Sequence, residues 1–329
     1  MKRICLFAGY DSQNKIDDYV VLYVKELSKL ADVFYLADSD IPKEELEKIK
    51  PFTQKAFAKR HTLYDFGSWS LLVQELGWKK LEEYDEVLFV NDSCYAPLFD
   101  LKPIFEKMEN EHLDAWGLAA NHFMMSFFLA FDKKIIKNPR FRHFIESIKK
   151  EKDKNIIIRK YEKGLDTFLK DEGYKTGAYF TPKKLEEFYK KNKGKIKKDL
   201  KEILPFSERL FMRFRPNKIR LYGNDCFLNM AYGFPLLKKL ALTSNPDLFS
   251  KNYKKFIKKY SKYDSHLIEA NLKRLNPHYG DITLLQILKR RFSNFLNGFL
   301  IEKKYKKNYY IIRFFKIPIY KKKMDYSIK

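Results

Sequence analysis

Residues 84–93 read YDEVLFVNDS, and they say more about the architecture of this chain than any other stretch. A run of apolar residues, typical of a buried strand, leads directly into the polar triplet Asn91-Asp92-Ser93. In an open parallel sheet, ligands bind beyond the carboxyl ends of the strands. A carboxylate there can hold a hard divalent cation, which in turn holds a diphosphate. We therefore expect Asp92 to be a metal or diphosphate contact, although Asp and Asn also cap turns at such positions.

Strand-like and helix-like segments alternate on both sides of this stretch. Short apolar runs predict strands at residues 3–9, 32–36, 54–59, 114–118 and 125–131. Apolar residues at helical spacing predict helices at residues 20–30, 44–49, 68–76, 101–108, 134–150 and from 158 onward. This alternation predicts an α/β fold, a mainly parallel sheet flanked by helices.

Composition excludes several classes of protein. The chain has 329 residues, 45% of them apolar and 16% aromatic, which is not the composition of a disordered protein. Its uncharged stretches, among them 121–131 and 292–301, are shorter than the roughly 20 residues of a membrane-spanning helix. The basic and then apolar start is too short to be a signal peptide, so we expect a first strand of a cytoplasmic protein. The three cysteines provide neither a disulfide framework nor a four-cysteine zinc site.

The net charge of +24 is concentrated toward the C-terminus, where residues 251–329 carry 21 Lys and Arg against five Asp and Glu. A second basic stretch, residues 183–201, lies in a lysine-rich segment, 183–220, that we expect to be helical. Such charge attracts phosphate on nucleic acid, on anionic lipid or on a substrate. From residue 282 the tail has helical periodicity, which fits a basic amphipathic helix on a bilayer surface. The alternative is a helix that packs on the domain and shows its lysines to water.

Two further segments contain residue types that carry chemistry. Residues 64–69, YDFGSW, join a strand-like segment to a helix. Asp65 could contact a nucleotide or sugar hydroxyl while Gly67 allows close backbone approach, or Asp65 or Ser68 could simply cap the helix.

Residues 161–166, YEKGLD, place Glu162 and Asp166 on one helix edge, where a carboxylate could act as a general base. The alternative is a solvated helix face. The sequence has no phosphate-binding glycine loop, serine-hydrolase motif or zinc-protease motif, and no two histidines have metal-site spacing. His122, after a predicted strand end, could contact an acceptor or a metal, or lie in a surface loop.

These segments together resemble the rhamnan synthesis protein F family of glycosyltransferases. The matching pieces are residues 9–11, 16–20, 64–69, 85–99, 116–118, 126–131, 161–165 and 233–238 (GFPLLK), with Asn245-Pro246 behind them. The resemblance covers roughly residues 1–250. It implies a GT-A-like fold over 1–250, with 251–329 left as a basic helical C-terminal region that could anchor the protein at a membrane surface.

The resemblance also implies roles for particular residues. Asn91-Asp92-Ser93 stands where such enzymes often carry Asp-x-Asp, so Asp92 would orient a Mg²⁺ or Mn²⁺ ion held mainly by phosphate and water. Asp65 would contact the nucleotide, with Gly67 and Ser68 beside it, and Tyr10 and Asp11 would lie near the base.

On the acceptor side, Glu162 is the candidate base for an inverting reaction, with Asp166 and Asp114 as alternates. Trp116 and His122 are the candidate acceptor contacts.

The expected function is transfer of a sugar, rhamnose or another deoxy sugar, from a nucleoside-diphosphate donor to a surface polysaccharide such as capsule or lipopolysaccharide. The acceptor would be lipid-linked and the enzyme peripheral, at the inner face of the membrane. One alternative is a non-catalytic assembly subunit with a degenerate donor site. Another is a nucleic-acid-binding protein, but no recognition motif appears and lysine greatly outnumbers arginine in the basic segments, so no specific nucleic acid is expected.

Overall fold

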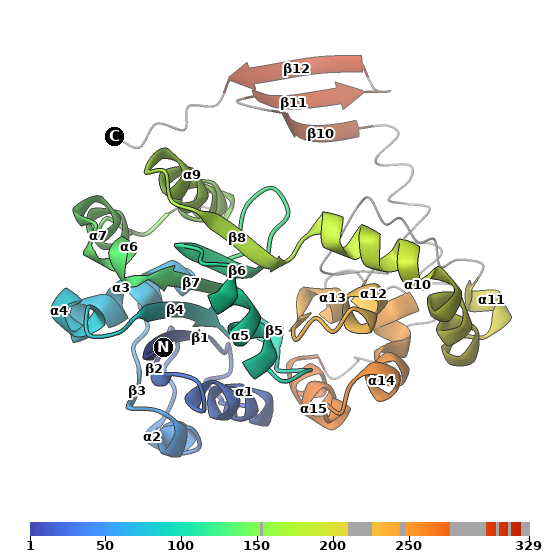
Figure 1. Cartoon of the computed structure of the whole chain (residues 1–329), viewed down its shortest axis with the longest axis horizontal. Helices are drawn as coiled ribbons and strands as arrows, with labels where there is room; N and C mark the ends of the chain where they lie inside the picture. Colours follow the sequence, from blue (N-terminus) through green and yellow to red (C-terminus); the bar gives the residue numbers. More distant parts are fainter. Residues whose placement is uncertain are drawn as a thin grey trace.

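The computed structural model describes residues 1–151, 154–209, 226–243, 248–276, 301–306, 309–314 and 317–323. Its centre is a seven-stranded sheet with the order β3-β2-β1-β4-β7-β6-β8 (Figure 1). The strands of this sheet are β1 (Arg3–Gly9), β2 (Asp32–Ala37), β3 (Lys55–Ala58), β4 (Glu86–Asn91), β6 (Ala115–Ala119), β7 (Phe128–Asp132) and β8 (Thr176–Phe180). Within it, β7 runs antiparallel to both neighbours and the other six strands share one direction. The expected α/β fold with a mainly parallel sheet is confirmed.

Alternation of side chains along the strands divides the core into two layers. On β1, Cys5 and Phe7 belong to one buried cluster, and Ile4, Leu6 and Ala8 belong to the other. Because both faces of the strand are apolar, helices must cover both sides of the sheet.

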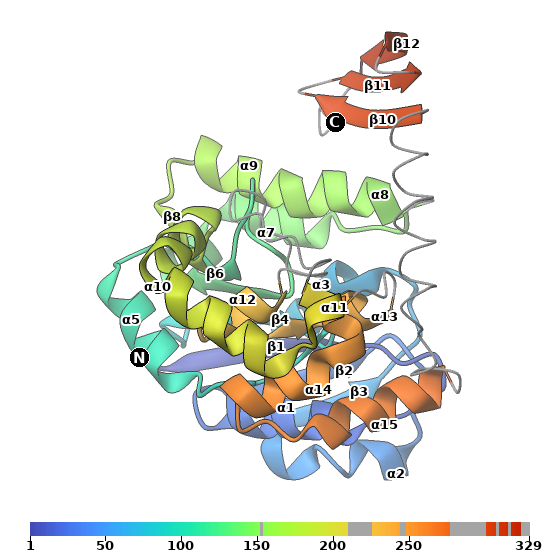
Figure 2. The ribbon, with the colours of Figure 1, turned by 90° about the vertical axis from the view of Figure 1, so that its right-hand side faces the viewer.

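The first layer is covered by helices from both ends of the chain. They are α1 (Asp18–Ser28), α5 (Lys102–Asn110), α10 (Pro182–Ile203), α12 (Cys226–Ala231), α13 (Leu240–Thr243), α14 (Leu248–Tyr260) and α15 (Ser265–Leu275). Figure 2 shows α15 beside α1 on this side of the molecule.

The second layer is covered by helices from the middle of the chain. They are α3 (Tyr64–Leu76), α4 (Trp78–Leu81), α6 (Lys133–Lys137), α7 (Pro139–Glu146), α8 (Lys154–Ile157) and α9 (Lys163–Asp171). The remaining short helices are α2 (Lys43–Leu46), η1 (Lys50–Phe52) and α11 (Phe206–Arg209). None of the helices in the described ranges is both long and apolar enough to cross a bilayer.

The helix expected over residues 134–150 is two helices, α6 and α7. Pro139 lacks the amide hydrogen that would continue α6, and it occupies the first position of α7. The Asn138 side chain caps α7 by accepting from the backbone amides of Arg140 and Phe141. The helix expected from residue 158 begins earlier, at Lys154, and passes through a π-helical turn, Ile158–Glu162, labelled η2.

The lysine-rich segment 183–220 is helical in its described part, as α10 and α11, and residues 210–225 lie outside the described ranges. The C-terminal region differs more from expectation. α14 begins before residue 251, and its residues Phe249, Phe256 and Ile257 are buried in the first layer. The boundary expected at residue 250 therefore falls inside a helix that belongs to the core.

Beyond α15, the described part of the tail is not helical. Strands β10 (Ile301–Lys306), β11 (Tyr309–Phe314) and β12 (Ile317–Lys323) form an antiparallel sheet. Residues 309–312 are Tyr-Tyr-Ile-Ile, and such aromatic and β-branched residues favour strands over helices. The amphipathic helix expected from residue 282 falls on residues 277–300, which lie outside the described part of the chain.

Candidate functional site

The residues that follow the parallel strands β1 to β4 meet at one edge of the sheet. The amide of Asp38, after β2, donates to the carbonyl of Gly9 at 2.9 Å, and the amide of Asp92, after β4, donates to that of Ala8 at 3.2 Å. We call this the strand-end edge: Tyr10-Asp11, Asp38-Ser39, Arg60-His61 and Asn91-Asp92-Ser93. It is where a doubly wound sheet offers a ligand site.

Asp92 lies at this edge, with its carboxylate turned toward protein donors. Its Oδ2 accepts from the Tyr10 amide at 3.2 Å and lies 3.8 Å from Lys239 Nζ. Only 10% of the side chain is exposed. Burial raises the pKa of Asp92, although Lys239 and the Tyr10 amide act in the opposite direction. Asp92 is thus a nearly buried acid behind the exposed surface of the edge.

Asn91 and Ser93 continue a hydrogen-bonded chain along the edge. Asn91 Nδ2 donates to Asp65 Oδ2 at 2.8 Å, and Asn91 Oδ1 accepts from Ser93 Oγ at 2.6 Å and from the Ser93 amide at 3.1 Å. Lys238 Nζ in turn donates to Ser93 Oγ at 2.8 Å. The structure therefore brings Asp65 and the triplet together, and the sequence analysis expected both near the nucleotide-sugar donor. It also places Lys238 there, which the sequence analysis did not name as a site residue.

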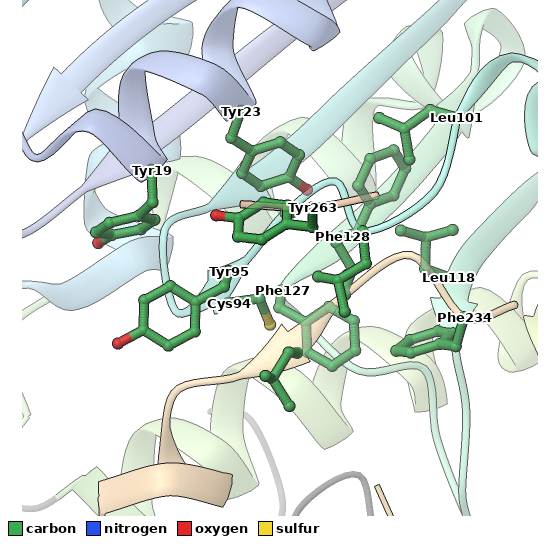
Figure 3. Close-up of a cluster of buried hydrophobic side chains, with 14 of the residues drawn as sticks. Tyr19, Tyr23, Cys94, Tyr95, Leu101, Leu118, Phe127, Phe128, Phe234 and Tyr263 are labelled. Carbon is green, nitrogen blue, oxygen red and sulfur yellow. The ribbon is translucent and has the colours of Figure 1, made fainter. Parts of the chain in front are cut away.

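Lys238 and Lys239 reach the edge through a two-stranded ribbon. β5 (Cys94–Tyr95) follows the triplet and pairs antiparallel with β9 (Leu237–Lys238), so that Cys94 lies opposite Lys238. The ribbon packs on a buried cluster that includes Tyr95, Phe127 and Phe234 (Figure 3). The signal for these lysines was present in the sequence: GFPLLK ends in Lys238, and Lys239 follows it.

Asp11, expected near the base, is held by an arginine from a distant helix. Arg274 on α15 donates to Asp11 Oδ2 at 2.5 Å and to Asp17 Oδ2 at 2.7 Å. Asp11 Oδ1 also accepts from the backbone amides of Gln13 and Lys15. With these donors in place, Asp11 stabilises the loop after β1. No local pattern connects Arg274 with residue 11, which explains why sequence reasoning missed it.

Gly67 and Ser68 are enclosed by protein. A Cβ added at Gly67 would lie 2.0 Å from Leu63 Cβ, so the glycine permits the tight entry into α3. Ser68 is 1% exposed, and its Oγ lies 3.0 Å from His61 Nε2. His61 Nδ1 accepts from the Leu63 amide, so the proton of the neutral ring is on Nε2 and points to Ser68. In this arrangement both residues shape the loop before α3 and are not available as direct nucleotide contacts.

Two exposed tyrosines lie at or beside the edge: Tyr10 belongs to it, and Tyr64 precedes Asp65, which is hydrogen-bonded to Asn91. Tyr10 is 51% exposed and Tyr64 is 47% exposed. The Arg60 guanidinium lies 5.9 Å from the centre of the Tyr10 ring. Tyr64 has a φ of 59°, in the left-handed region, a conformation that costs a non-glycine residue energy. Exposed aromatic rings of this kind can stack on a nucleobase.

Glu162 lies beside the start of β7, which is at the strand-end edge because β7 is antiparallel. Ser126 Oγ donates to Glu162 Oε1 at 2.8 Å, and the Phe127 carbonyl accepts from the Asn91 amide at 3.3 Å. Glu162 ends the π-helical turn, a local geometry frequent at functional sites. A pocket here is lined by Phe66, Met124, Ser126, Leu129, Glu162, Leu165 and Asp166. Asp166 pairs with Lys170 at 2.6 Å.

The three remaining candidates are dispersed. Trp116 is 3% exposed, and its Nε1 donates to Glu86 Oε1 at 2.7 Å, at the opposite end of β4. The expectation that it contacts an acceptor is therefore corrected: its side chain points into the first layer. Asp114 directly precedes β6, at that same far edge, and pairs with Lys134, so it lies too far from Glu162 to share a site with it. His122 is exposed in the loop after β6, on the strand-end side.

The model of the family described as rhamnan synthesis protein F matches residues 33–309, which is most of the chain. This chain belongs to the rhamnan synthesis protein F family. The resemblance read from the sequence motifs is thereby confirmed. No curated protein sequence matches the chain.

Several solved structures are similar in fold. Residues 1–349 of TarS from S. aureus share 15% identity, with 99% of this chain and 100% of that chain covered and a TM-score of 0.37. The apo-form glycosyltransferase GlyE of Streptococcus pneumoniae TIGR4 shares 14% identity, with 90% of this chain and 64% of that chain covered and a TM-score of 0.37. Core-mannan synthase A of Aspergillus fumigatus, in an Mn/GDP form, shares 9% identity, with coverages of 44% and 63% and a TM-score of 0.25. Likenesses this distant say nothing about the reaction of this chain.

The donor set of this family member does not fit a divalent cation. Among the residues that the structure describes, no group of three or more His, Cys, Asp or Glu side chains could hold a metal ion. Asn91 Oδ1 is turned to Ser93, and Asp92 Oδ2 is turned to the Tyr10 amide and Lys239. A cation at Asp92 would have a single carboxylate ligand and an ammonium group beside it, whereas Mg²⁺ and Mn²⁺ prefer several oxygen ligands.

Proposed function

We propose that this chain is a glycosyltransferase that moves a sugar from a nucleoside-diphosphate donor onto a growing surface polysaccharide. One observation carries the proposal: in a chain of a rhamnan synthesis family, the strand-end edge brings Asp65, the Asn91-Asp92-Ser93 triplet and two lysines together. Rhamnose or another deoxy sugar is the donor sugar that the family description favours. The GT-A-like domain of the same proposal extends beyond residue 250, because α14 and α15 belong to its core.

The donor would lie across the strand-end edge. Tyr10 and Tyr64 offer exposed rings for the base, and Asp65 offers carboxylate oxygen to a ribose or sugar hydroxyl. The diphosphate would then reach Ser93 at the end of β4. In this pose the nucleotide contacts expected at Tyr10, Asp65 and Ser93 are kept, while Asp11, Gly67 and Ser68 act by shaping the loops.

Transfer requires one bond to break and one to form. The bond between the sugar C1 and the diphosphate oxygen breaks, and its electron pair stays on that oxygen. The acceptor hydroxyl oxygen bonds to C1, and its proton passes to a carboxylate. Glu162 is the proposed base, because it lines a pocket near Asn91 and its Oε1 is oriented by Ser126. Asp166, in the same pocket, is the alternate.

The acceptor is proposed to be lipid-linked, which would place the enzyme at the inner face of the membrane. The exposed lysines of α10, among them Lys193, Lys197 and Lys201, would face anionic headgroups. The tail from residue 282 would add to this charge. An anionic membrane surface is thus the proposed partner, with the glycan acceptor held upon it.

The experiment that tests the proposal is a binding and transfer panel. Purified protein is titrated with UDP, GDP, dTDP and CDP, each with and without Mn²⁺, and release of the nucleoside diphosphate from the matching nucleotide sugar is then followed in the presence of membranes. We expect saturable binding of one nucleotide and slow sugar transfer. No binding to any of the four nucleotides under either condition would refute the proposal.

A second candidate is a non-catalytic assembly subunit. The observation that favours it is the triplet itself, whose side-chain oxygens are turned toward protein donors. The same panel separates the two: nucleotide binding without any turnover on family-appropriate acceptors would support the subunit.

A further inference from the structure

We propose that Lys238 and Lys239 neutralise the donor diphosphate, at the place where a metal-dependent transferase holds a divalent cation. This inference rests on the proposed function, because it assigns the diphosphate contacts of the same site. Two observations lead to it. The Asn91-Asp92-Ser93 triplet offers too few oxygen ligands for a divalent cation, and two lysines lie beside the triplet.

The backbone fixes both lysines against the triplet. Lys238 is paired with Cys94 in the β5–β9 ribbon, and the Lys239 amide donates to the carbonyl of Ser93 at 3.1 Å. The Leu98 amide donates to the carbonyl of Pro235 at 2.7 Å, which holds the other end of the ribbon. These backbone contacts fix the Cα positions of both lysines beside the triplet, and the side-chain contacts described next place their ammonium groups.

Lys238 has the contacts expected of a lysine that binds an anion. Its Nζ donates to Ser93 Oγ at 2.8 Å and lies 5.1 Å from the centre of the Phe127 ring. Among the described residues, no carboxylate lies within ion-pair distance of it. A half-buried ammonium whose partners are a hydroxyl and a ring keeps its charge and its remaining N–H donors for a ligand. The Ser93 hydroxyl proton is directed to Asn91 Oδ1, so Ser93 would have to turn it to a phosphate oxygen to join this contact.

Tyr19 and Asp92 orient the Lys239 side chain, and its ammonium group stays available to a ligand. Its Nζ lies 4.6 Å from the centre of the Tyr19 ring and 3.8 Å from Asp92 Oδ2, which is beyond hydrogen-bond length. An exposed fraction of 21% leaves part of the side chain open to a ligand. Asp92 is in this arrangement a positioning residue: it holds the ammonium by charge and the Tyr10 amide by a hydrogen bond.

The surrounding acids do not cancel this charge. Asp11 is paired with Arg274, and the Asp65 carboxylate accepts from the Asn91 amide group. In the described part of the chain, Asp92 is the only acid that forms an ion pair with either lysine, so the sum of the charges of the two lysines and Asp92 is positive. As the bond from C1 to the diphosphate oxygen breaks, the leaving group gains negative charge that two fixed ammonium groups stabilise while keeping their own protons.

The test is nucleotide affinity measured by calorimetry, using the nucleoside diphosphate selected by the panel above. Wild-type protein should bind it with the same affinity, within about twofold, in EDTA and in Mn²⁺. Lys238→Met and Lys239→Met should each weaken binding about tenfold or more, as loss of a charge-assisted hydrogen bond predicts. The parent nucleoside, which lacks phosphate, should show no such loss.

Two controls keep the result interpretable. Lys238→Arg and Lys239→Arg keep the charge and should retain most of the affinity even where the Met variants are less stable. Lys184→Met changes another half-buried lysine, which donates to the carbonyls of Ala178 and Tyr179 on β8, and should leave affinity unchanged. Binding by wild type that requires Mn²⁺ and persists in both Met variants would overturn the inference while leaving the proposed function standing. Absence of any nucleotide binding by wild type would overturn both.

Discussion

Asp92 is the residue on which most of the sequence interpretation depended, and the structure changes its role. It was expected to face a metal or diphosphate directly, and it lies at the expected edge with only a tenth of its side chain exposed. Its neighbours are polar and cationic, so the end of β4 remains the candidate donor site. In the site that we propose, Ser93, Lys238 and Lys239 make the contacts with phosphate.

The buried carboxylate gives stability a pH dependence. Burial raises the pKa of Asp92 above its ordinary value of 3.8, so the folded state keeps a proton where the unfolded chain has lost it. The free energy of unfolding should therefore fall as pH rises through that window. Asp92→Asn removes this contribution, so the variant should gain stability relative to wild type from about pH 4 toward neutral. Urea unfolding at several pH values measures this, and a pH-independent difference would contradict it.

Glu162 allows a direct test of base catalysis. Glu162→Gln should lower kcat about 10²- to 10⁴-fold with little change in the donor KM, because the amide cannot take the acceptor proton. Initial rates at saturating donor measure this. Asp114→Asn, at the opposite edge, is the matched control and should leave kcat unchanged, and a full loss in Asp166→Asn with none in Glu162→Gln would assign the base to Asp166 instead.

At the level of single residues, the sequence predicted the site residues that follow strands, but not those that are distant along the chain and reach the site only in the folded structure. Asp65 and Asp92 could be located because a strand end is visible in the local pattern. Lys239 and Arg274 reach the same edge from residues more than a hundred positions away, through pairing and packing that one sequence does not encode locally. Trp116 was placed on the acceptor side through the family resemblance, and the sequence did not reveal that both faces of β6 are buried.

Among the helices, α15 has the clearest structural role. Arg274 joins it to the loop after β1 and to the start of α1 through Asp11 and Asp17. Arg274→Met leaves two partly buried carboxylates without their cation, so we expect a loss of about 1–3 kcal/mol in the free energy of unfolding. Chemical denaturation measures the loss.

The neighbouring residue provides the control for this prediction. Lys273 lies on the same turn of α15 and pairs with Glu269 in an exposed setting. Lys273→Met should cost less than about 1 kcal/mol. Equal losses in the two variants would contradict a special role for the Arg274 contacts.

Elements with strong apolar patterns were predictable, and interruptions were less so. β1, β2 and β4 lie where the apolar runs indicated, because both faces of these strands are buried. The helix break at Pro139 was missed because the helical spacing of apolar residues continues past the proline. The antiparallel direction of β7 was missed because it depends on which strands pair, and one sequence does not show that. The strands after residue 300 were missed because lysines between aromatic residues fit either an amphipathic helix or an edge strand.

For the whole molecule, the surface charge leads to a prediction about membranes. Replacing Lys193, Lys197 and Lys201 on α10 with glutamine should weaken binding to phosphatidylglycerol vesicles by about 1 kcal/mol per lysine that faces the surface. Vesicle sedimentation measures this, with phosphatidylcholine vesicles as the uncharged control. Unchanged binding to the anionic vesicles would remove α10 from the proposed membrane contact.

The most direct measurement is a crystal structure of the full-length protein with its nucleoside diphosphate bound. We expect the phosphate oxygens to lie within hydrogen-bond distance of Ser93 Oγ and of the Lys238 and Lys239 ammonium groups, with the base toward Tyr10. A nucleotide bound elsewhere, for example at the opposite edge beside Asp114, would contradict the placement of the donor site at the end of β4.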